Sequence, residues 1–454
     1  MQGRVPTLRE HLYMHISKLS KRILSAVLFA AMLAASELGL SYALEPVSYA
    51  KWFKDDLKAI EKDGQDADLV IVGGSRTFRS FVPSVLEEEL GFDCVINGGS
   101  ALQSLSGSYY QLKELTERFR PKYAVLAVTW NGLTYGIGTQ SNLIVLDRLS
   151  GLNKLEFIKN GFTDDDRLFA LLKSYRFRKN LTIEDLEEIH ADKKTLAENG
   201  GEPFVKEGDI YSDTGFVYSY ESIPQGNVPV THHGIYDWTE IHQDRVEYLE
   251  KIVALCKEKD IQLMLVSAPS TMMQIYNIDS YQPAVDYYEE FAAKNGLIYH
   301  NLNFLKDREE LLPDTMFMDY NHLNGEGAEV LSKVYAEILA KDLAGEDTSP
   351  YFYRDLYELQ QDVDRVAAVS AEITPLEAEG KYSVHFSSLH SPEITPYYAL
   401  FVKNSDGSLT KISDWSQEEN IPAVSLALGT SIIVRAGTRG DDSEKNIAWQ
   451  EYEL

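Results

Sequence analysis

Cysteine and positive charge are both scarce in this chain. Its 454 residues include only two cysteines, Cys94 and Cys256, and each lies in an apolar stretch. We therefore expect buried small side chains rather than a disulfide or a metal pair. The 43 lysines and arginines are outnumbered by 70 aspartates and glutamates, which gives a formal net charge of -27. A surface this acidic repels phosphate backbones, so we expect no binding to nucleic acid.

Repeats and low-complexity tracts are also lacking, and 44% hydrophobic with 25% charged residues is a globular composition. The length exceeds one ordinary core, so two folded domains and a terminal appendage are predicted. The histidine pair His232-His233 has no matching carboxylate cluster, and adjacent side chains point apart in a strand. We therefore predict no metal site and no cofactor.

One long hydrophobic run stands near the N-terminus, from Ile23 to Leu44, interrupted by Glu37. The basic residues before it, which give the positive-inside pattern of an exported chain, are Arg4, Arg9, Lys18, Lys21 and Arg22. A cleaved signal peptide would fit Ser41-Tyr42-Ala43, and a soluble core helix is a third interpretation. We favour a retained single-pass membrane anchor because the basic region is long for a signal peptide. The remainder would then be extracytoplasmic.

Short apolar runs alternate with helical patterns over the middle of the chain. The runs that predict strands are 67–72, 93–96, 123–128, 261–267 and 297–301. The segments that predict helices between and after them are 83–90, 106–118, 244–259, 281–295 and 325–343. Continuous apolar strands separated by helices indicate a parallel sheet covered on both faces. The predicted fold class is therefore α/β, with a doubly wound parallel sheet.

Two regions depart from this alternation. Residues 132–240 are rich in charge, Gly, Asn and Tyr, and predict a long insertion with only one or two helices, such as 183–199. From residue 373 onward, short alternating runs split by turn residues predict an antiparallel β-sandwich. That module would be a spacer or would bind carbohydrate or cell wall. Tyr211, Tyr218 and Tyr220 in the insertion would pack in the fold or stack on sugars.

The predicted domain organisation follows from these patterns. Its parts are a cytoplasmic basic segment (1–22), a transmembrane anchor (23–44), a linker (45–66), an α/β domain (67–346) with an insertion at about 132–240, a linker with a helix over 353–370 (347–372) and a β-sandwich (373–454).

A serine on a glycine-rich turn is the first candidate for chemistry. Ser75 follows Val72-Gly73-Gly74 directly after the first strand and just before a helix. Ligands of open parallel sheets bind beyond the carboxyl ends of the strands, so its hydroxyl and backbone N–H would face a ligand there. A plain tight turn or a phosphate-cradling loop has the same pattern, but no Lys-Ser/Thr follows, so it is not a Walker loop.

The second candidate is Asp319-Tyr320-Asn321-His322, just before the closing helix. An Asp and a His three residues apart in a turn can place the carboxylate on one imidazole nitrogen while the other nitrogen faces a serine. His322 would then be the general base, and Asp319 would fix its tautomer. The alternative is a helix-capping or core histidine beside an ordinary turn aspartate.

Asn and Gly residues after the second and third strands could complete such a site. The Asn131 amide ends the third strand, and Asn97-Gly98-Gly99-Ser100 ends the second, although Asn-Gly after a strand is also an ordinary turn. Both could donate hydrogen bonds to an oxyanion. We also expect the residues next to these motifs to contact the substrate, namely Arg76, Arg79 and Trp130.

In order and placement these motifs resemble the SGNH (GDSL-type) hydrolase superfamily over about Ala67 to Leu343. The resemblance implies a flavodoxin-like α/β fold with a catalytic triad and an oxyanion hole. It implies the triad Ser75, His322 and Asp319, with oxyanion donors from Ser75 N–H, Gly98 or Gly99, and Asn131.

Two positions depart from the usual family pattern. Gly74 stands where the family has Asp before the nucleophile, and Thr129-Trp130-Asn131-Gly132 replaces Gly-x-Asn-Asp. These departures, with the N-terminal anchor, look like the branch of the teichoic acid D-alanine-transfer protein and the periplasmic polysaccharide O-acetyltransferases. That resemblance implies an acyltransferase or esterase acting on a cell-wall or exopolysaccharide polymer. The alternatives are a non-catalytic polymer-binding protein on this scaffold and an accessory partner of a membrane O-acyltransferase.

Overall fold

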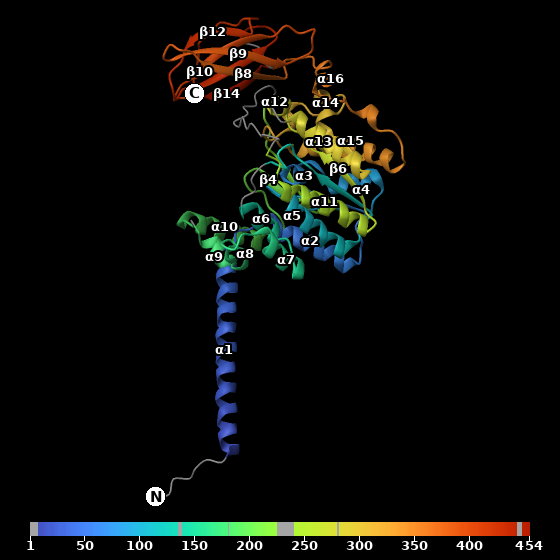
Figure 1. Ribbon diagram of the computed structural model, residues 1–454, viewed down its shortest axis with the longest axis vertical. Helices are drawn as coiled ribbons and strands as arrows, with labels where there is room; N and C mark the ends of the chain where they lie inside the picture. The colour runs from blue at the N-terminus through green and yellow to red at the C-terminus, as the bar shows by residue number, and fades with distance from the viewer. Residues whose placement is uncertain (1–7, 135–138, 180, 225–239, 279–280, 443–446) are drawn as a thin grey trace. The chain divides into compact units, whose positions relative to one another are not determined.

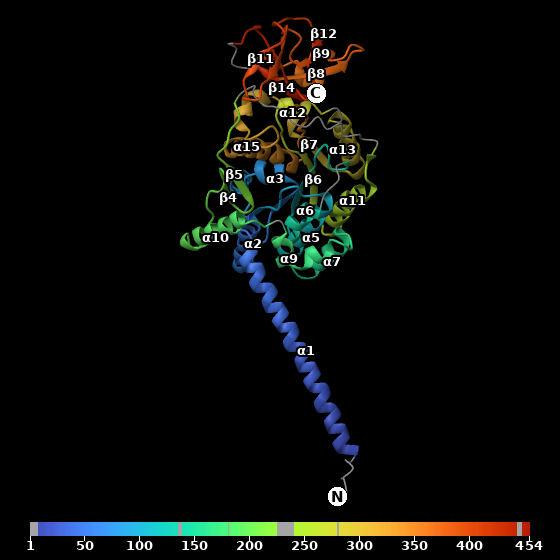
Figure 2. The same ribbon diagram turned by 90° about the vertical axis from the view of Figure 1, so that its left-hand side faces the viewer.

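The computed structural model describes the chain except for residues 1–7, 135–138, 180, 225–239, 279–280 and 443–446 (Figures 1 and 2). The chain divides into two compact units. The larger unit combines Tyr49–Phe157 with Pro203–Leu454, and the smaller unit combines Met1–Ser48 with Ile158–Glu202. The insertion that the sequence predicts over about 132–240 is therefore divided between them.

A five-stranded parallel sheet forms the centre of the larger unit, in the order β2-β1-β3-β6-β7. Its strands are β1 (Leu69–Val72), β2 (Val95–Asn97), β3 (Tyr123–Ala127), β6 (Gln262–Ser267) and β7 (Ile298–Asn301). Most of their side chains are buried, as continuous apolar runs in a covered sheet require. This is a doubly wound order, in which ligands bind beyond the carboxyl ends of the strands. The predicted α/β fold class is confirmed.

Helices cover both faces of this sheet (Figure 1). The helices of this α/β region are α3 (Ser75–Ser80), α4 (Pro83–Leu90), α5 (Leu105–Phe119), α11 (Gln243–Glu258), α12 (Met272–Tyr276), α13 (Tyr281–Asn295), α14 (Arg308–Leu311) and α15 (Gly325–Leu343), of which α12 packs on the C-terminal strand β8. α5 packs against α11, and α15 packs against α4 and α3. α4, α13 and α15 have the bounds that the sequence predicts. In α4 both ends have a local cause, because Pro83 suits the first turn and Gly91 takes a left-handed conformation after the last.

The segment between the N-terminal helix and the sheet is not a free linker. It forms α2 (Tyr49–Asp63), which buries Trp52, Phe53 and Leu57. Trp52 stacks on Tyr211, with ring centroids 5.9 Å apart. This packing makes α2 part of the larger unit and shows that Tyr211 has a structural role.

The insertion contains more helix than the sequence predicts. Its described elements are α6 (Thr139–Leu146), α7 (Gly151–Gly161), α8 (Arg167–Leu171), α9 (Lys173–Arg178), α10 (Ile183–Glu198) and the antiparallel hairpin of β4 (Asp209–Ser212) and β5 (Phe216–Ser219). Helices this short show little periodicity, because their stability comes from packing rather than from their own sequence. Of these elements, the sequence predicts α10, which in the structure begins at a Thr182–Asp185 capping box.

The C-terminal region is an antiparallel β-sandwich, as predicted. One sheet contains β8 (Ala368–Pro375), β9 (Lys381–Leu389) and β12 (Asn420–Ser425), and the other contains β10 (Tyr397–Lys403), β11 (Leu409–Lys411), β13 (Ser431–Gly437) and β14 (Ala448–Glu453). A continuous core joins it to α12, since Met272, Met273 and Ile275 cluster with Val366 and Val369. The sandwich therefore packs directly on the α/β domain.

The linker before the sandwich differs from the prediction. The helix expected over 353–370 is wrong, because only α16 (Leu356–Gln360) is helical and β8 begins at Ala368. The apolar stretch 366–369 is fully buried, and its last two residues pair with β9. Such a short apolar run fits a strand or a helix equally well, and here pairing with β9 decides. The described part of the chain also contains the 3-10 turns η2 (Leu302–Phe304), η3 (Asp314–Met316) and η4 (Ser349–Tyr351).

The smaller unit consists of α1 (Leu8–Leu44) together with α8, α9 and α10. Within the described residues, α1 contains the one segment long and apolar enough to cross a membrane, Ser20–Leu44, with a mean hydropathy of 2.0. A membrane anchor and a signal sequence both have this property. α9 packs against the C-terminal part of α1.

Candidate active site

Ser75 lies on a sharp turn between β1 and α3. Gly73 has a φ of +151°, and a Cβ there would lie 2.4 Å from Thr77 Oγ1 and 2.8 Å from the Ala127 carbonyl oxygen. The turn therefore requires glycine at this position. Gly74 is different, because the nearest atom to a Cβ would be 3.8 Å away. A side chain at position 74 would therefore fit, and packing does not explain why glycine stands there. The neighbouring Ser75 is half-exposed.

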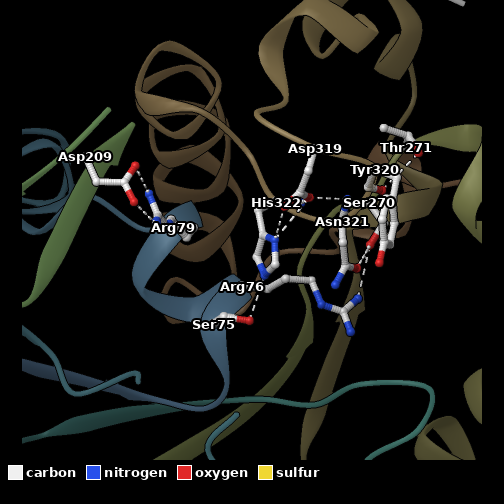
Figure 3. A network of polar contacts seen from close by, with 10 residues as sticks. All are labelled: Ser75, Arg76, Arg79, Asp209, Ser270, Thr271, Asp319, Tyr320, Asn321 and His322. Atoms are coloured by element: carbon white, nitrogen blue, oxygen red, sulfur yellow. Dashed lines mark hydrogen bonds and ion pairs between the residues drawn. The ribbon is translucent and has the colours of Figure 1, made fainter. Parts of the chain in front are cut away.

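The structure brings Ser75, His322 and Asp319 together (Figure 3). The His322 Nε2 lies 2.7 Å from the Ser75 Oγ, and its Nδ1 lies 2.9 Å from the nearer Asp319 carboxylate oxygen. One ring nitrogen thus faces the hydroxyl while the other is held by a carboxylate. This is the relation that a general base needs to take the serine proton.

The Asp319 carboxylate is held by the turn that contains it. It accepts hydrogen bonds from the backbone N–H groups of Asn321 at 2.7 Å and His322 at 2.8 Å. Burial by itself would raise the pKa of Asp319, but the hydrogen bonds and the charge of His322 outweigh it and hold that pKa below its ordinary value. Asp319 is therefore an ionised acceptor at neutral pH.

His322 is not a helix cap. The N-cap of α15 is Asn324, whose side chain accepts a hydrogen bond from Gly327 N–H at 2.9 Å. The backbone N–H of Met318 bonds to the His322 carbonyl at 2.9 Å, which closes the turn. The imidazole therefore does not cap α15 and can form a hydrogen bond with Ser75.

The Gly98 and Gly99 N–H groups, which the sequence predicts as oxyanion donors, have other acceptors in this conformation. Gly98 N–H bonds to the Ile71 carbonyl at 2.7 Å, as an extension of the pairing between β2 and β1. Gly99 N–H bonds to the Asn97 side-chain oxygen at 3.1 Å. To stabilise an oxyanion, each of these N–H groups would have to leave its present acceptor or be shared with it. Glycine at these positions has a packing reason, because a Cβ on Gly99 would lie 2.6 Å from Thr77 Cβ.

Asn131 follows β3 and keeps its donor end available. Its side-chain oxygen accepts a hydrogen bond from the Thr129 hydroxyl at 2.8 Å. This contact fixes the amide so that its NH₂ group is left for another acceptor, and we find no bond from that group within the described part of the chain. Asn131 therefore remains a candidate oxyanion donor.

Arg76 lies beside the triad in a buried position. Its guanidinium carbon is 3.8 Å from the centre of the Trp130 ring, and one amino group donates to Ser270 Oγ at 3.1 Å. Ser270 in turn donates to the Asn321 side-chain oxygen at 3.1 Å, which links α3 to the loop of the triad (Figure 3). Burial lowers the pKa of Arg76 to about 10, so it stays charged. No carboxylate contacts it among the described residues, which is unusual for a buried cation.

Arg79 differs from the prediction that it contacts substrate. Both of its amino groups bond to the Asp209 carboxylate, one at 2.8 Å, and both side chains are nearly buried (Figure 3). A bidentate pair of this kind neutralises the Arg79 charge within the protein and fixes the orientation of its guanidinium. Its effect is to fasten β4 to the helix that carries Ser75.

The insertion tyrosines have separate positions. Tyr211 is buried and donates to Asp56, so it serves packing. Tyr218 lies against Gly325 at the start of α15, where a Cβ would be 2.2 Å from its ring. Tyr220 is 64% exposed, and its ring centroid is 4.9 Å from that of Tyr218. Of these three, Tyr218 packs at the start of α15, and Tyr220 presents an exposed ring next to it.

Some site residues were missed at the sequence level. Ser270 follows the carboxyl end of β6, the edge where ligands bind, so its place in the sheet was a usable signal. Asp209 had no comparable signal, because its role depends on how the hairpin folds back on α3.

The structure describes only some of the residues that were considered as metal ligands. Within the described part of the chain, no group of three or more His, Cys, Asp or Glu side chains could hold a metal ion. The pair His232-His233 lies outside the described residues. His242, in contrast, precedes α11 as its N-cap residue.

Comparisons with known proteins give structural similarity at low scores. No curated protein matches the chain, and one protein-family model, which names no activity, matches residues 233–344. A structure described as a lipolytic protein of the G-D-S-L family, from Desulfitobacterium hafniense, is 11% identical and covers 60% of this chain and 99% of its own, with a TM-score of 0.29. A GDSL-like lipase from Bacteroides thetaiotaomicron is 12% identical and covers 65% of this chain and 100% of its own, with a TM-score of 0.30.

A third structure, a gut microbial diltiazem-metabolizing enzyme, is 11% identical and covers 79% of this chain and 72% of its own, with a TM-score of 0.31. Identities and scores of this size assign neither an activity nor a substrate. The chain is similar in structure to GDSL-type lipolytic and acylhydrolase proteins, and what it does must be inferred from its own residues.

Proposed function

We propose that this chain is a membrane-anchored, extracytoplasmic acyltransferase or esterase of the SGNH type that acts on a cell-envelope polymer. The observation that carries the proposal is the continuous hydrogen-bonded path from Ser75 Oγ through both nitrogens of His322 to Asp319, with distances of 2.7 and 2.9 Å. A serine hydroxyl is a weak nucleophile unless a base accepts its proton, and this path supplies that base.

In the proposed reaction, His322 Nε2 takes the proton of the Ser75 hydroxyl as Oγ bonds to the carbonyl carbon of an ester. The charged oxygen of the tetrahedral intermediate would accept hydrogen bonds from Ser75 N–H and the Asn131 amide. When the ester bond breaks, the leaving alcohol takes the proton back from His322 and an acyl-serine remains. A second alcohol or water, deprotonated by His322, then releases the acyl group. Exclusion of water decides between transfer and hydrolysis.

An anionic envelope polymer is the substrate class that we propose. Arg76 supports it, because a buried guanidinium without a carboxylate partner among the described residues can bind an anionic group strongly. The exposed Tyr220 supports a sugar-containing chain, since aromatic faces pack on the apolar faces of sugars. An acyl group such as O-acetyl is the proposed cargo. The N-terminal basic segment and α1 support the extracytoplasmic location.

A second candidate is a protein of the same location that binds the polymer or works only beside a membrane O-acyltransferase. The observation that favours it is the incomplete oxyanion hole, in which the Gly98 and Gly99 N–H groups have other acceptors. A partner that reorganised this loop would switch the site on.

Covalent labelling with a fluorophosphonate probe tests the main proposal. The full chain in detergent should be labelled, and Ser75→Ala and His322→Ala should both abolish the signal. Ser408→Ala in the β-sandwich is the matched control and should label like the wild type. A folded wild type that stays unlabelled would overturn the proposal and favour the binding or partner-dependent alternative.

A further inference from the structure

The acidic residue within the apolar run of α1 is surrounded by hydrogen-bond donors. Glu37 accepts hydrogen bonds from Ser41 Oγ at 3.0 Å, from Ser174 N–H at 3.1 Å and from the Ser174 hydroxyl. Ser174 belongs to α9, in the same compact unit. A carboxylate in a membrane helix is costly unless it is paired, and here the pairing comes from a segment far along the chain.

Two more contacts hold the insertion to the last turns of α1. Lys173 pairs with Glu45, and the Lys193 ammonium donates to the carbonyl oxygens of Tyr42 and of Ala43, the latter at 3.0 Å. Cleavage after Ala43 would take Glu37, Tyr42 and Ala43 away from α9 and α10 but would leave Glu45. The contacts therefore support a retained helix.

The level of α9 relative to a bilayer follows from helix geometry. Glu37 lies seven residues before the end of α1, or about 10 Å at 1.5 Å per residue. The uncharged stretch between Arg22 and Glu37, residues 23–36, spans about 21 Å, and snorkelling of Lys21 and Arg22 lets such a stretch fit the ~30 Å of a hydrocarbon core. If that part crosses the membrane, α8 and α9 lie at the polar boundary on the outer side. Figure 1 shows these helices gathered around the end of α1.

The surface of α8 and α9 suits that boundary. Leu168, Leu171 and Leu172 are exposed, at 50%, 56% and 36%. Arg178 lies 5.0 Å from the centre of the Tyr175 ring, and the Lys179 ammonium lies 5.0 Å from that of Phe169. Both cations are exposed, and neither contacts a carboxylate in the described part of the chain. We call Leu168, Leu171, Leu172, Arg178 and Lys179 the juxtamembrane patch.

We propose that the juxtamembrane patch lies in the interface of the bilayer that α1 crosses and binds the phosphate groups of anionic lipids. Exposed leucines beside basic and aromatic residues are the composition of interfacial membrane helices. The charges matter because a chain of net charge -27 is otherwise repelled by an anionic surface. The proposal rests on the retention of α1 but not on the chemistry of Ser75, so the two can fail separately.

Depth-dependent quenching tests the contact. The full chain with Leu171→Cys, labelled with an environment-sensitive fluorophore, is placed in single-copy nanodiscs with and without brominated acyl chains. Cys94 and Cys256 are buried and should not react. We expect strong quenching by bromine and a blue-shifted emission. Leu428→Cys, at a leucine 83% exposed on the β-sandwich, is the reference position for a label in water. A Leu171 label that stays unquenched and red-shifted would overturn the proposal, including the case in which a second copy or another protein covers the patch.

The lipid charge is tested with photoactivatable phosphatidylglycerol and phosphatidylcholine in the same nanodiscs. We expect cross-linking to favour the anionic lipid, and Arg178→Gln with Lys179→Gln to reduce that preference. Each basic residue near the surface contributes about fivefold, so the loss should be roughly 25-fold. The matched control is Arg120→Gln with Lys122→Gln, which removes two exposed cations that are paired with Asp66 and Asp68. Equal preference in all three proteins would remove the anionic lipid from the proposal.

Discussion

Helix α3 uses buried arginine in two different ways at its two ends. Arg79, near the C-terminal end, is paired with Asp209, so its charge is neutralised within the protein. Arg76, next to Ser75, is stacked on Trp130, and its one hydrogen bond within the described residues is to the Ser270 hydroxyl. A buried cation without an anion is costly and persists where something else compensates it. The comparison teaches that the Arg79 end serves the fold, whereas the charge of Arg76 is the one that the proposed function assigns to binding an anionic group.

The largest effect is expected from a substitution in the catalytic triad, and it should be on the labelling rate. In Asp319→Asn the shape of the turn is retained, but the amide favours the wrong imidazole tautomer at His322. We expect the rate of fluorophosphonate labelling to fall by about ten-thousand-fold, as for other triads. A variant that labels at more than a tenth of the wild-type rate would contradict the role of Asp319.

At the Arg79 end of α3, a substitution should instead lower the free energy of unfolding. Asp209→Asn leaves the Arg79 cation buried and unpaired, which costs about 3 to 5 kcal/mol in the free energy of unfolding. Denaturant unfolding of the full chain measures this loss. Asp55→Asn is the control, because Asp55 pairs with Lys51 and Lys58 on an exposed surface where such pairs contribute at most about 1 kcal/mol. Equal losses in both variants would mean that the Arg79–Asp209 pair does not fasten the hairpin of β4 and β5 to α3.

This contrast was only partly visible in the sequence. The strands, α4, α13 and α15 follow from apolar runs and capping residues, which are local signals. The positions of Ser75, Asp319 and His322 follow from those strand ends, since a doubly wound sheet gathers them at one edge. Arg76 and Arg79 look alike in the sequence, and only the return of β4 onto α3 distinguishes them.

The oxyanion donors show the same limit. A Gly-Gly pair after β2 marks where backbone N–H groups could be free, but not where they point. In the structure, the side chain of Asn97 accepts from Gly99 N–H while its amide group donates to the carbonyls of Thr77 and Phe81 at 3.0 and 2.8 Å. That three-way contact depends on α3 lying above β2, which is a tertiary feature.

Arg76 gives the next effect in size. Replacing it with Gln should raise KM for an ester with an anionic acyl or acceptor group by roughly 10- to 100-fold, because a charge-assisted hydrogen bond contributes about 1.5 to 3 kcal/mol. KM for a neutral ester with the same leaving group should change little. Arg76→Lys keeps the charge but not the fork geometry, so we expect partial recovery with the anionic ester.

A loss of kcat with both esters would indicate a different role for Arg76. It would then act through Ser270 and Asn321 to position the turn that carries His322, rather than bind substrate. In that case Ser270→Ala should reproduce the loss of kcat, whereas under the substrate-binding role it should leave KM for the anionic ester close to that of the wild type.

The smallest expected effect is on how the free energy of unfolding depends on pH. The folded pKa of Asp319 lies below its ordinary value, so the folded protein holds this proton less tightly than the unfolded chain does. The resulting stabilisation is present above the ordinary carboxyl range and is lost as the pH falls through the folded pKa. Asp319→Asn removes it, so the free energy of unfolding of the variant should fall less steeply on acidification than that of the wild type. Asp209 pairs with Arg79 and not with His322, so Asp209→Asn should leave the Asp319 part of the slope in place. Parallel slopes for the wild type and Asp319→Asn would mean that the hydrogen bonds from Asn321, from His322 N–H and from the imidazole do not favour the ionised carboxylate.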